Sequence, residues 1–164
     1  MDSLEGDCFG TAPSPERVLI ETFDFVELCC GLRSLLSAAV ARAGLRVGPR
    51  IDLAVHPMWD LRALRVVEWI LFIAERRRVW WWHSRVPCAD FSVADRPARG
   101  DTYEVYRVVC LLAMVLVRVG FGTLVHEQPT SAHSWQFGFL DWFVRQPGAS
   151  MDRLCACRFG APFC

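Results

Sequence analysis

The chain alternates between short apolar runs and longer stretches with helical periodicity. Runs rich in aromatic and β-branched residues predict strands at 23–30, 51–55, 79–84, 123–126 and 154–159. Leucine, alanine and valine recurring every three or four positions predict helices at 32–43, 61–77, 103–119 and 137–145. Gly44 and Gly120 follow two of these helices directly and are suited to end them.

The helix expected at 61–77 has the most regular pattern. Its core-facing side is predicted to comprise Leu61, Leu64, Val67, Ile70, Leu71 and Ala74. The charged side chains of this segment lie on the opposite side of the helical wheel.

The alternation of strands and helices predicts an α/β fold, with an open, mostly parallel sheet and helices on both faces. The length of 164 residues suits one domain, which we place at 21–164, after a polar and poorly ordered leader at 1–20. In such sheets ligands bind at the carboxyl ends of the strands, so the residues that follow each strand are the candidates for function.

Composition narrows the class of protein. Hydrophobic residues make up 53% of the chain, which excludes a disordered segment. The net charge of zero excludes nucleic-acid binding by bulk positive charge alone, although every basic side chain is arginine, as in a GC-rich coding sequence. The longest apolar run, 108–117, is about half the length of a membrane-spanning helix, and the acidic N-terminal segment does not resemble a signal peptide. We therefore expect an intracellular protein without a membrane partner.

The eight cysteines fit reduced thiols in an intracellular protein better than a disulfide scaffold. Cys155, Cys157 and Cys164 lie close together near the C-terminus, where a metal site is conceivable. Their spacing matches no standard zinc motif and no histidine pair follows them, so we expect no bound metal.

The first two predicted strands are followed by candidate cofactor-binding residues. Cys29, Cys30 and Gly31 follow the first strand and lead at once into a helix, where a glycine allows close approach of a ligand to the backbone. Asp52 comes about 20 residues later, where an acidic residue can bind ribose hydroxyls. Asp60 either caps the next helix or meets an adenine amino group. An ordinary strand-to-helix turn explains the glycine equally well.

The other two strand ends carry candidate catalytic residues. Cys88 lies in a polar loop after the strand at 79–84, and Arg85, Arg96 and Arg99 beside it would favour its reactive thiolate. Glu127 follows the strand at 123–126, where we expect burial to make it an acid. The ordinary alternatives are an unremarkable loop cysteine and a solvated strand end.

Taken in order, these segments resemble the S-adenosylmethionine-dependent DNA cytosine-5 methyltransferases. The sequence Pro-Cys-Ala-Asp-Phe-Ser at 87–92 is similar to the Pro-Cys-x-x-Phe-Ser nucleophile loop of that family. The segment 25–44 is similar to its cofactor loop, and Glu-Gln-Pro at 127–129 stands where the family has Glu-Asn-Val or Glu-Asn-Pro. Order and approximate spacing agree over about residues 23–130.

The resemblance implies a Rossmann-like methyltransferase fold and a role for each residue. Cys88 would attack C6 of a cytosine flipped out of DNA, and Glu127 would hold the N3 edge of that base. The methionine part of S-adenosylmethionine would lie beside Cys29, Cys30 and Gly31, with its ribose at Asp52 and its adenine at Asp60. Arg85, Arg96 and Arg99 would contact DNA.

The chain also departs from the family. Arg33 or Ser34 stands at the second glycine of the cofactor loop, and Gln128 replaces asparagine. We expect the fold to be incomplete, because a chain that ends at Cys164 lacks the target-recognition domain of these enzymes.

Two other functions compete with this interpretation. A non-catalytic α/β interaction module would use the tryptophans and arginines for packing and partner contact. A cysteine hydrolase would pair Cys88 with His83 or His126, while His56 and His133 are also available.

Overall fold

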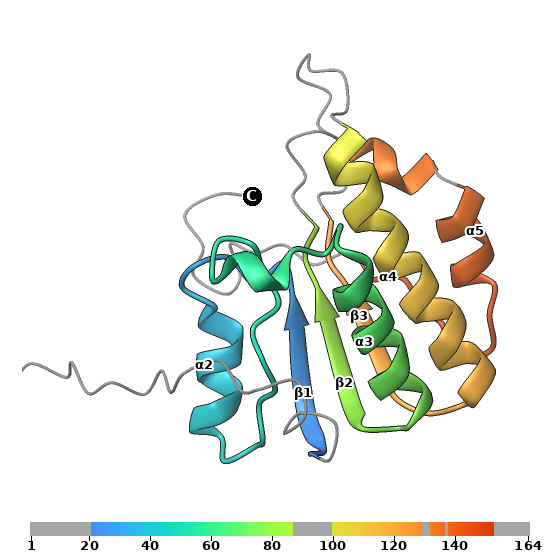
Figure 1. Cartoon of the computed structure of the whole chain (residues 1–164). Coiled ribbons are helices and arrows are strands. Elements are labelled where there is room, and N and C mark those ends of the chain that lie inside the picture. Colours follow the sequence, from blue (N-terminus) through green and yellow to red (C-terminus); the bar gives the residue numbers. More distant parts are fainter. Residues whose placement is uncertain (1–20, 87–99, 129–131, 137, 153–164) are drawn as a thin grey trace, which may run out of the picture.

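The sheet has three parallel strands. The computed structural model describes residues 21–86, 100–128, 132–136 and 138–152. Within these, β1 (Phe23–Leu28), β2 (Val79–Ser84) and β3 (Thr123–His126) pair in the order β1-β2-β3, and their arrows point the same way in Figure 1. The strands expected at 79–84 and 123–126 are confirmed, and the one expected at 23–30 ends at Leu28.

The strand expected at 51–55 is wrong. The segment that runs beside β1 comes earlier and makes only isolated parallel bridges, Val47 with Phe25 and Ile51 with Leu28. Gly48 lies so close to β1 that a Cβ atom there would stand 2.7 Å from a methyl group of Val26. Beyond Ile51 the chain turns instead of extending, and residues 53–55 belong to that turn.

Four helices of the described residues accompany the sheet: α2 (Leu35–Arg42), α3 (Leu64–Glu75), α4 (Gly100–Val119) and α5 (Gly138–Val144). Short 3-10 turns, η1 (Pro57–Trp59) and η3 (His133–Gln136), connect them to the strands. All four expected helices are present, although α3 begins three residues later than expected and α4 three residues earlier. The helix α2 also begins three residues late. The reason is Ser34, whose φ of 43° lies in the left-handed region and cannot continue an α-helix.

Helices lie on both faces of the sheet. In Figure 1, α3 and α4 cross the sheet side by side, α5 lies beyond α4, and α2 stands next to β1. The main core, between the sheet and these two crossing helices, includes Val26, Leu28, Ile70, Ile73, Trp82 and Leu112. Successive strand residues point to opposite faces, so Glu27 lies on the other face, where it binds Ser37 of α2. The described part of the chain is therefore an α/β structure with a small open parallel sheet.

The buried side of α3 agrees only in part with the expected one. Leu61, Ile70 and Ala74 are buried as expected, but Leu64 is 67% exposed, and Val66 and Ile73 are buried in addition. Apolar residues surround this helix on nearly every side between 66 and 74, so periodicity alone does not distinguish two neighbouring orientations. Packing against α4 and the sheet selects the orientation.

Several expectations fall outside the described residues. These are the leader at 1–20, the loop at 87–99 that holds Cys88, and the strand expected at 154–159. Among the helices that are described, none combines the length and the apolar character needed to cross a membrane.

Candidate functional site

A continuous row of paired residues brings the strand ends together. Leu28 of β1 pairs with Ser84 of β2, which pairs with His126 of β3, and on the other side Leu28 bridges Ile51. Neighbouring strands lie about 4.8 Å apart, so these four positions span roughly 14 Å. The residues that follow them all leave from one edge of the sheet, which we call the carboxyl edge.

Two predicted cofactor residues are in direct contact at this edge. The Gly31 N–H donates to Oδ2 of Asp52 at 2.8 Å, across 21 positions of sequence. The other oxygen of Asp52 accepts the Ala54 N–H at 2.7 Å, which produces the turn after Ile51. Gly31 has φ +65°, and no atom lies within 4 Å of the position that a Cβ atom would take. The space beside this glycine is open.

Cys29 and Cys30 form the loop between β1 and Gly31. Both are partly buried free thiols, and Cys29 has a left-handed φ of 57°. Its N–H donates to the Ile51 carbonyl at 2.9 Å, so the backbone here is tied to the neighbouring segment. Burial, and then the nearby Asp52 carboxylate, raise the pKa of both thiols. They are neutral groups and do not act as nucleophiles at neutral pH.

Asp60 follows η1, and its carboxylate is bound by Arg62, two residues later in the chain. Its Oδ1 lies 2.9 Å from Nε of Arg62 and also accepts the Arg62 N–H, and its Oδ2 accepts from the same guanidinium. The side-chain hydrogen bond from Arg62 is the main cause that lowers the pKa of Asp60. The expectation that Asp60 caps the next helix is wrong, because Ala63 occupies the N-cap of α3.

The structure describes only some of the candidate residues that follow β2 and β3. The expectation that Glu127 is buried is wrong, since its side chain is 54% exposed. Arg85 is exposed after β2, and its N–H donates to the Leu28 carbonyl at 3.3 Å. Cys88, Arg96 and Arg99 lie outside the described residues.

Two buried titratable side chains lie together at this edge, and the sequence pointed to only one of them, His83, as a partner of Cys88 in a hydrolase. Glu27 of β1 and His83 of β2 are only 5% and 4% exposed. Oε1 of Glu27 lies 3.6 Å from Nδ1 of His83, and the other ring nitrogen, Nε2, lies 3.2 Å from Oε1 of Glu127. The three side chains form a line from the interior to the surface, which we call the Glu27–His83–Glu127 chain.

Hydrogen bonds from α2 and the loop before it anchor the inner end of this chain. Oε2 of Glu27 accepts from the Ser37 hydroxyl at 2.5 Å, from the Ser37 N–H at 3.1 Å and from the Ser34 hydroxyl at 3.1 Å. Burial by itself would raise the pKa of Glu27, but His83 and these donors outweigh it, so the pKa is lowered. Burial likewise opposes the charge of His83, and the two carboxylates outweigh it, so the pKa of His83 is raised.

Once the structure is known, a signal for the Glu27–His83–Glu127 chain can be recognised in the sequence. Glu27 and His83 lie in mostly apolar runs, FDFVELCC and VWWWHS, in which the other polar residues are Asp24 and Ser84. A charge placed at a buried strand position needs a partner, because an unpaired buried charge is strongly unfavourable. The register, which sets Glu27 opposite His83, supplies that partner.

His126, the second histidine considered for a hydrolase, has a different character. It lies in β3 with its ring 5.7 Å from that of Tyr106. Burial, and then the charge of His83, lower the pKa of His126 to about 4. This imidazole is therefore neutral at pH 7.

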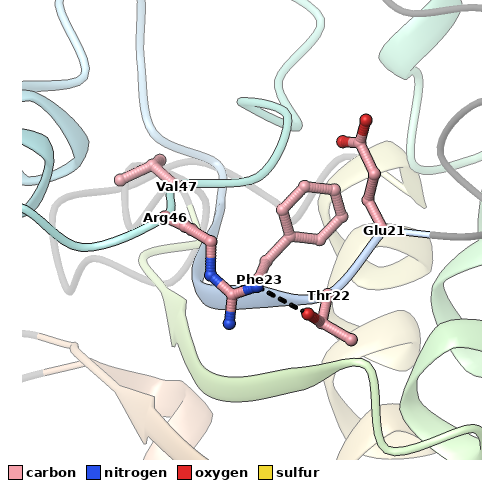
Figure 2. A pocket seen from close by; sticks show the side chains of 5 residues that line it. All are labelled: Glu21, Thr22, Phe23, Arg46 and Val47. Atoms are coloured by element: carbon pink, nitrogen blue, oxygen red, sulfur yellow. Dashed lines mark hydrogen bonds between the residues drawn. The ribbon is translucent and has the colours of Figure 1, made fainter.

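A hollow at the opposite edge of the sheet is not part of this site. Figure 2 shows it lined by Glu21, Thr22, Phe23, Arg46 and Val47, near the start of β1. The guanidinium of Arg46 donates to the Thr22 hydroxyl at 2.8 Å and to the carboxylate of Asp24. Since its cation is already paired, this hollow offers a ligand less than the carboxyl edge does.

Comparisons with known proteins assign no family. No protein-family model, no curated protein and no solved structure matches the chain. Within the described ranges, no group of three or more histidine, cysteine or acidic side chains is arranged to hold a metal ion.

Proposed function

We propose that this chain is a methyltransferase-like domain with an incomplete Rossmann-like fold, similar to the DNA cytosine-5 methyltransferases. In this proposal it binds S-adenosylmethionine at the carboxyl edge, with Cys88 as the nucleophile toward a flipped cytosine and Glu127 at the N3 edge of that base. DNA is the proposed partner, with Arg85, Arg96 and Arg99 as contacts to its phosphates.

One observation carries the proposal, the row formed by Ile51, Leu28, Ser84 and His126. The candidate segments of the sequence start directly beyond these four positions. The candidates follow the strands, and the parallel pairing brings the ends of neighbouring strands to one edge of the sheet. This convergence is what a ligand site in an open α/β sheet needs.

A hydrogen bond between the last two segments adds support. The side-chain amide of Gln128 donates from Nε2 to the Val86 carbonyl at 2.9 Å, and the Glu127 N–H donates to the Ser84 carbonyl at 2.9 Å. Val86 precedes Cys88 by two residues in the sequence. The amide of Gln128 serves this bond, so its replacement of the family's asparagine keeps a side chain able to donate there.

The residues present fit the proposed cofactor at two of its three parts. Asp52 keeps acceptor capacity for ribose hydroxyls, since each of its two oxygens has two acceptor sites and accepts one backbone N–H, from Gly31 or from Ala54. The open space beside Gly31 leaves room for the methionine part. Asp60 is the least suited, because three contacts with Arg62 leave it one acceptor site for an adenine amino group.

The cofactor and the protein supply different groups for the proposed reaction. S-adenosylmethionine, when bound, supplies the methyl group. Cys88 supplies the thiolate that adds to C6 of cytosine, and Glu127 supplies a carboxylate to hold the base. The base must leave the DNA stack for this contact, because its reacting atoms are shielded within the duplex.

Isothermal titration with S-adenosylmethionine tests cofactor binding directly. We expect saturable heat with the wild-type chain, and an affinity lowered on the order of tenfold or more in Asp52→Asn, since a hydrogen bond to a charged group is lost. Asp141→Asn is the matched control, because Asp141 is exposed on α5 and paired with Arg145. No heat with the wild type at high micromolar cofactor would contradict the proposal.

Transfer of a labelled methyl group to DNA tests the reaction. We expect Cys88→Ala to abolish transfer, because no other group replaces the thiolate. Cys110→Ala is the control: this thiol lies in α4, and burial raises its pKa to about 12. Full transfer by Cys88→Ala would exclude the proposed mechanism even if the cofactor binds.

The competing function, a non-catalytic interaction module, is favoured by one feature. Trp80 is 61% exposed and contacts Phe121, with ring centroids 5.2 Å apart, whereas Trp82 is fully buried in the core. Phe121 is partly buried, and an exposed tryptophan such as Trp80 is typical of a contact surface. A wild-type chain that neither binds S-adenosylmethionine nor methylates DNA would leave this function as the better one.

A further inference from the structure

A contribution to stability does not by itself explain the Glu27–His83–Glu127 chain. A buried ion pair contributes little to stability compared with apolar packing of the same volume. Here β1, β2 and the residue after β3 each contribute one titratable side chain at the edge where the candidate site lies. Only Glu127, the outermost member, is substantially exposed.

The surroundings of His83 determine its protonation. Each of its ring nitrogens has a carboxylate oxygen within ion-pair distance, at 3.6 Å from Nδ1 and 3.2 Å from Nε2, although neither contact has hydrogen-bond geometry. Carboxylates only accept hydrogen bonds. A neutral imidazole carries one N–H and would direct a lone pair at one of the two carboxylates. The imidazolium has a donor at both nitrogens and matches both neighbours.

The other groups around His83 do not compete for this proton. His126, the titratable neighbour on β3, has a pKa lowered to about 4 by burial and by His83, so it is neutral. Cys30 lies near Glu27, and burial raises the pKa of its thiol, so it is neutral as well. The ring of Phe25 stacks on that of His83, with centroids 6.4 Å apart and planes 27° apart, and this limits rotation of the imidazole.

We propose that His83 is a positioning residue: as an imidazolium anchored by Glu27, it holds the carboxylate of Glu127 in place at the carboxyl edge. This inference rests on the proposed function, in which Glu127 binds the target base. An exposed glutamate on its own samples several rotamers, and a fixed cation behind it selects one. Glu27 fixes the cation in turn, because Ser34 and Ser37 hold Oε2 while Oε1 faces His83.

A ring titration of the wild-type chain tests the pairing without any substitution. In 15N-labelled protein, long-range proton–nitrogen spectra report the protonation of each ring nitrogen of His83 between about pH 5 and 9. We expect both nitrogens to be protonated below a midpoint that lies above the ordinary value of 6.5. A midpoint of His83 at or below 6.5 would overturn the inference.

The variant Glu127→Gln separates positioning from burial. Glu127 is exposed, so its replacement leaves the fold intact, and we expect the midpoint of His83 to move to lower pH because one of two carboxylates is gone. Glu75→Gln, at an exposed glutamate of α3 that pairs with Arg118, is the control and leaves the midpoint unchanged. An equal midpoint in wild type and Glu127→Gln would show that the two residues do not interact.

The pH dependence of methyl transfer gives a readout that a purely structural role would not move. We expect kcat to fall as pH rises through the titration of His83, on the order of 100-fold once Glu127 is misplaced. In Glu27→Gln this fall moves to lower pH, because His83 loses its inner carboxylate. A pH profile unchanged in Glu27→Gln would overturn the positioning role.

The experiments distinguish a failure of the proposed function from a failure of the positioning role of His83. If the wild type binds no S-adenosylmethionine, the proposed function fails, while the ring titration still decides whether His83 pairs with Glu127. If cofactor binding and methyl transfer are present but His83 titrates independently of Glu127, the positioning role alone fails.

Discussion

β1 carries an ion pair at each end, and the two pairs differ in almost every physical property. Near its start, Asp24 pairs with Arg46, with 3.1 Å between Oδ1 and Nη2, and the arginine is well exposed. Near its end, Glu27 pairs with His83, and both side chains are buried. The two carboxylates are only three residues apart in the sequence, yet solvent screens one and not the other.

The difference in burial gives the two pairs different sensitivities to salt and pH. An exposed pair contributes little to stability and is weakened by salt, so Asp24 and Arg46 are suited to hold a surface segment in place. A buried pair is sensitive to the loss of either partner and to pH. The buried pair also lies at the carboxyl edge, whereas the exposed pair lies beside the hollow of Figure 2.

The largest effect is expected from Glu27→Ala. Removing this carboxylate leaves a buried cationic imidazole and the Ser34 and Ser37 donors without their acceptor, so the free energy of unfolding should fall by about 3–5 kcal/mol. Urea denaturation followed by circular dichroism measures it. The control Glu75→Ala, in a more exposed pair, should cost about 1 kcal/mol or less. Equal losses in the two variants would contradict the contrast between buried and exposed pairs.

A smaller loss is expected from Ser37→Ala, which removes the shortest hydrogen bond to Glu27. A hydrogen bond to a charged group contributes about 1.5–3 kcal/mol. The higher helix propensity of alanine in α2 offsets roughly 0.5 kcal/mol of that loss. The same denaturation experiment applies, with Ser150→Ala at an exposed position as control. A neutral Ser37→Ala would show that Glu27 does not depend on this donor.

The pH dependence of stability should expose the buried pair. Glu27 has a lowered pKa, so its contribution is present above its unfolded value of 4.5 and is lost as pH falls through the folded value. His83 has a raised pKa, so its contribution is present below its unfolded value of 6.5 and is lost as pH rises through the folded value. The stability advantage of the wild type over Glu27→Gln should therefore be largest between pH 4.5 and 6.5.

Unfolding curves for both proteins across this range measure that advantage. Glu127 and His126 are the other titratable groups that face His83, and both are present in the two proteins compared. An advantage that keeps growing above pH 8 would contradict the sign assigned to His83.

The smallest effect is expected from Asp24→Asn at the exposed pair. The Arg46 side chain, through its hydrogen bonds, lowers the pKa of Asp24, but both groups are in contact with solvent. We expect a slight loss of stability at low salt that disappears at about 1 M salt, where the screening length is about 3 Å. The loss in Glu27→Gln should persist at the same salt concentration. A salt-independent loss in Asp24→Asn would remove the distinction between the two ends of β1.

The pattern of apolar residues was sufficient to predict most elements but not all neighbours. The runs at 79–84 and 123–126 are strands with those bounds, because aromatic and β-branched residues favour the extended conformation. The apolar alternation at 51–55 was misleading, since Asp52 turns the chain through its bond to Ala54. The segment that lies beside β1 instead depends on Gly48 fitting against Val26, a contact between distant residues.

The sequence likewise predicted some features of the candidate site and not others. Gly31 and Asp52 were found from their spacing, and they do meet, but the N–H of Gly31 is used by Asp52 within the chain. Glu127 was found with the wrong surroundings, since it is exposed. Glu27 was missed and His83 was considered only as a hydrolase partner, because only the strand register shows that these residues of different strands lie opposite each other.

The sequence by itself determined the α/β alternation, the positions of the three strands and the candidates that follow them, since these depend on periodicity over a few neighbouring residues. The tertiary structure decided which of those residues touch, which side of α3 is buried and which carboxylates are shielded from water. These properties depend on contacts between residues far apart in the chain. For Glu27, the buried position in β1, the imidazole from β2 and the hydroxyls from Ser34 and Ser37 together turn an ordinary glutamate into the anchor of the carboxyl edge.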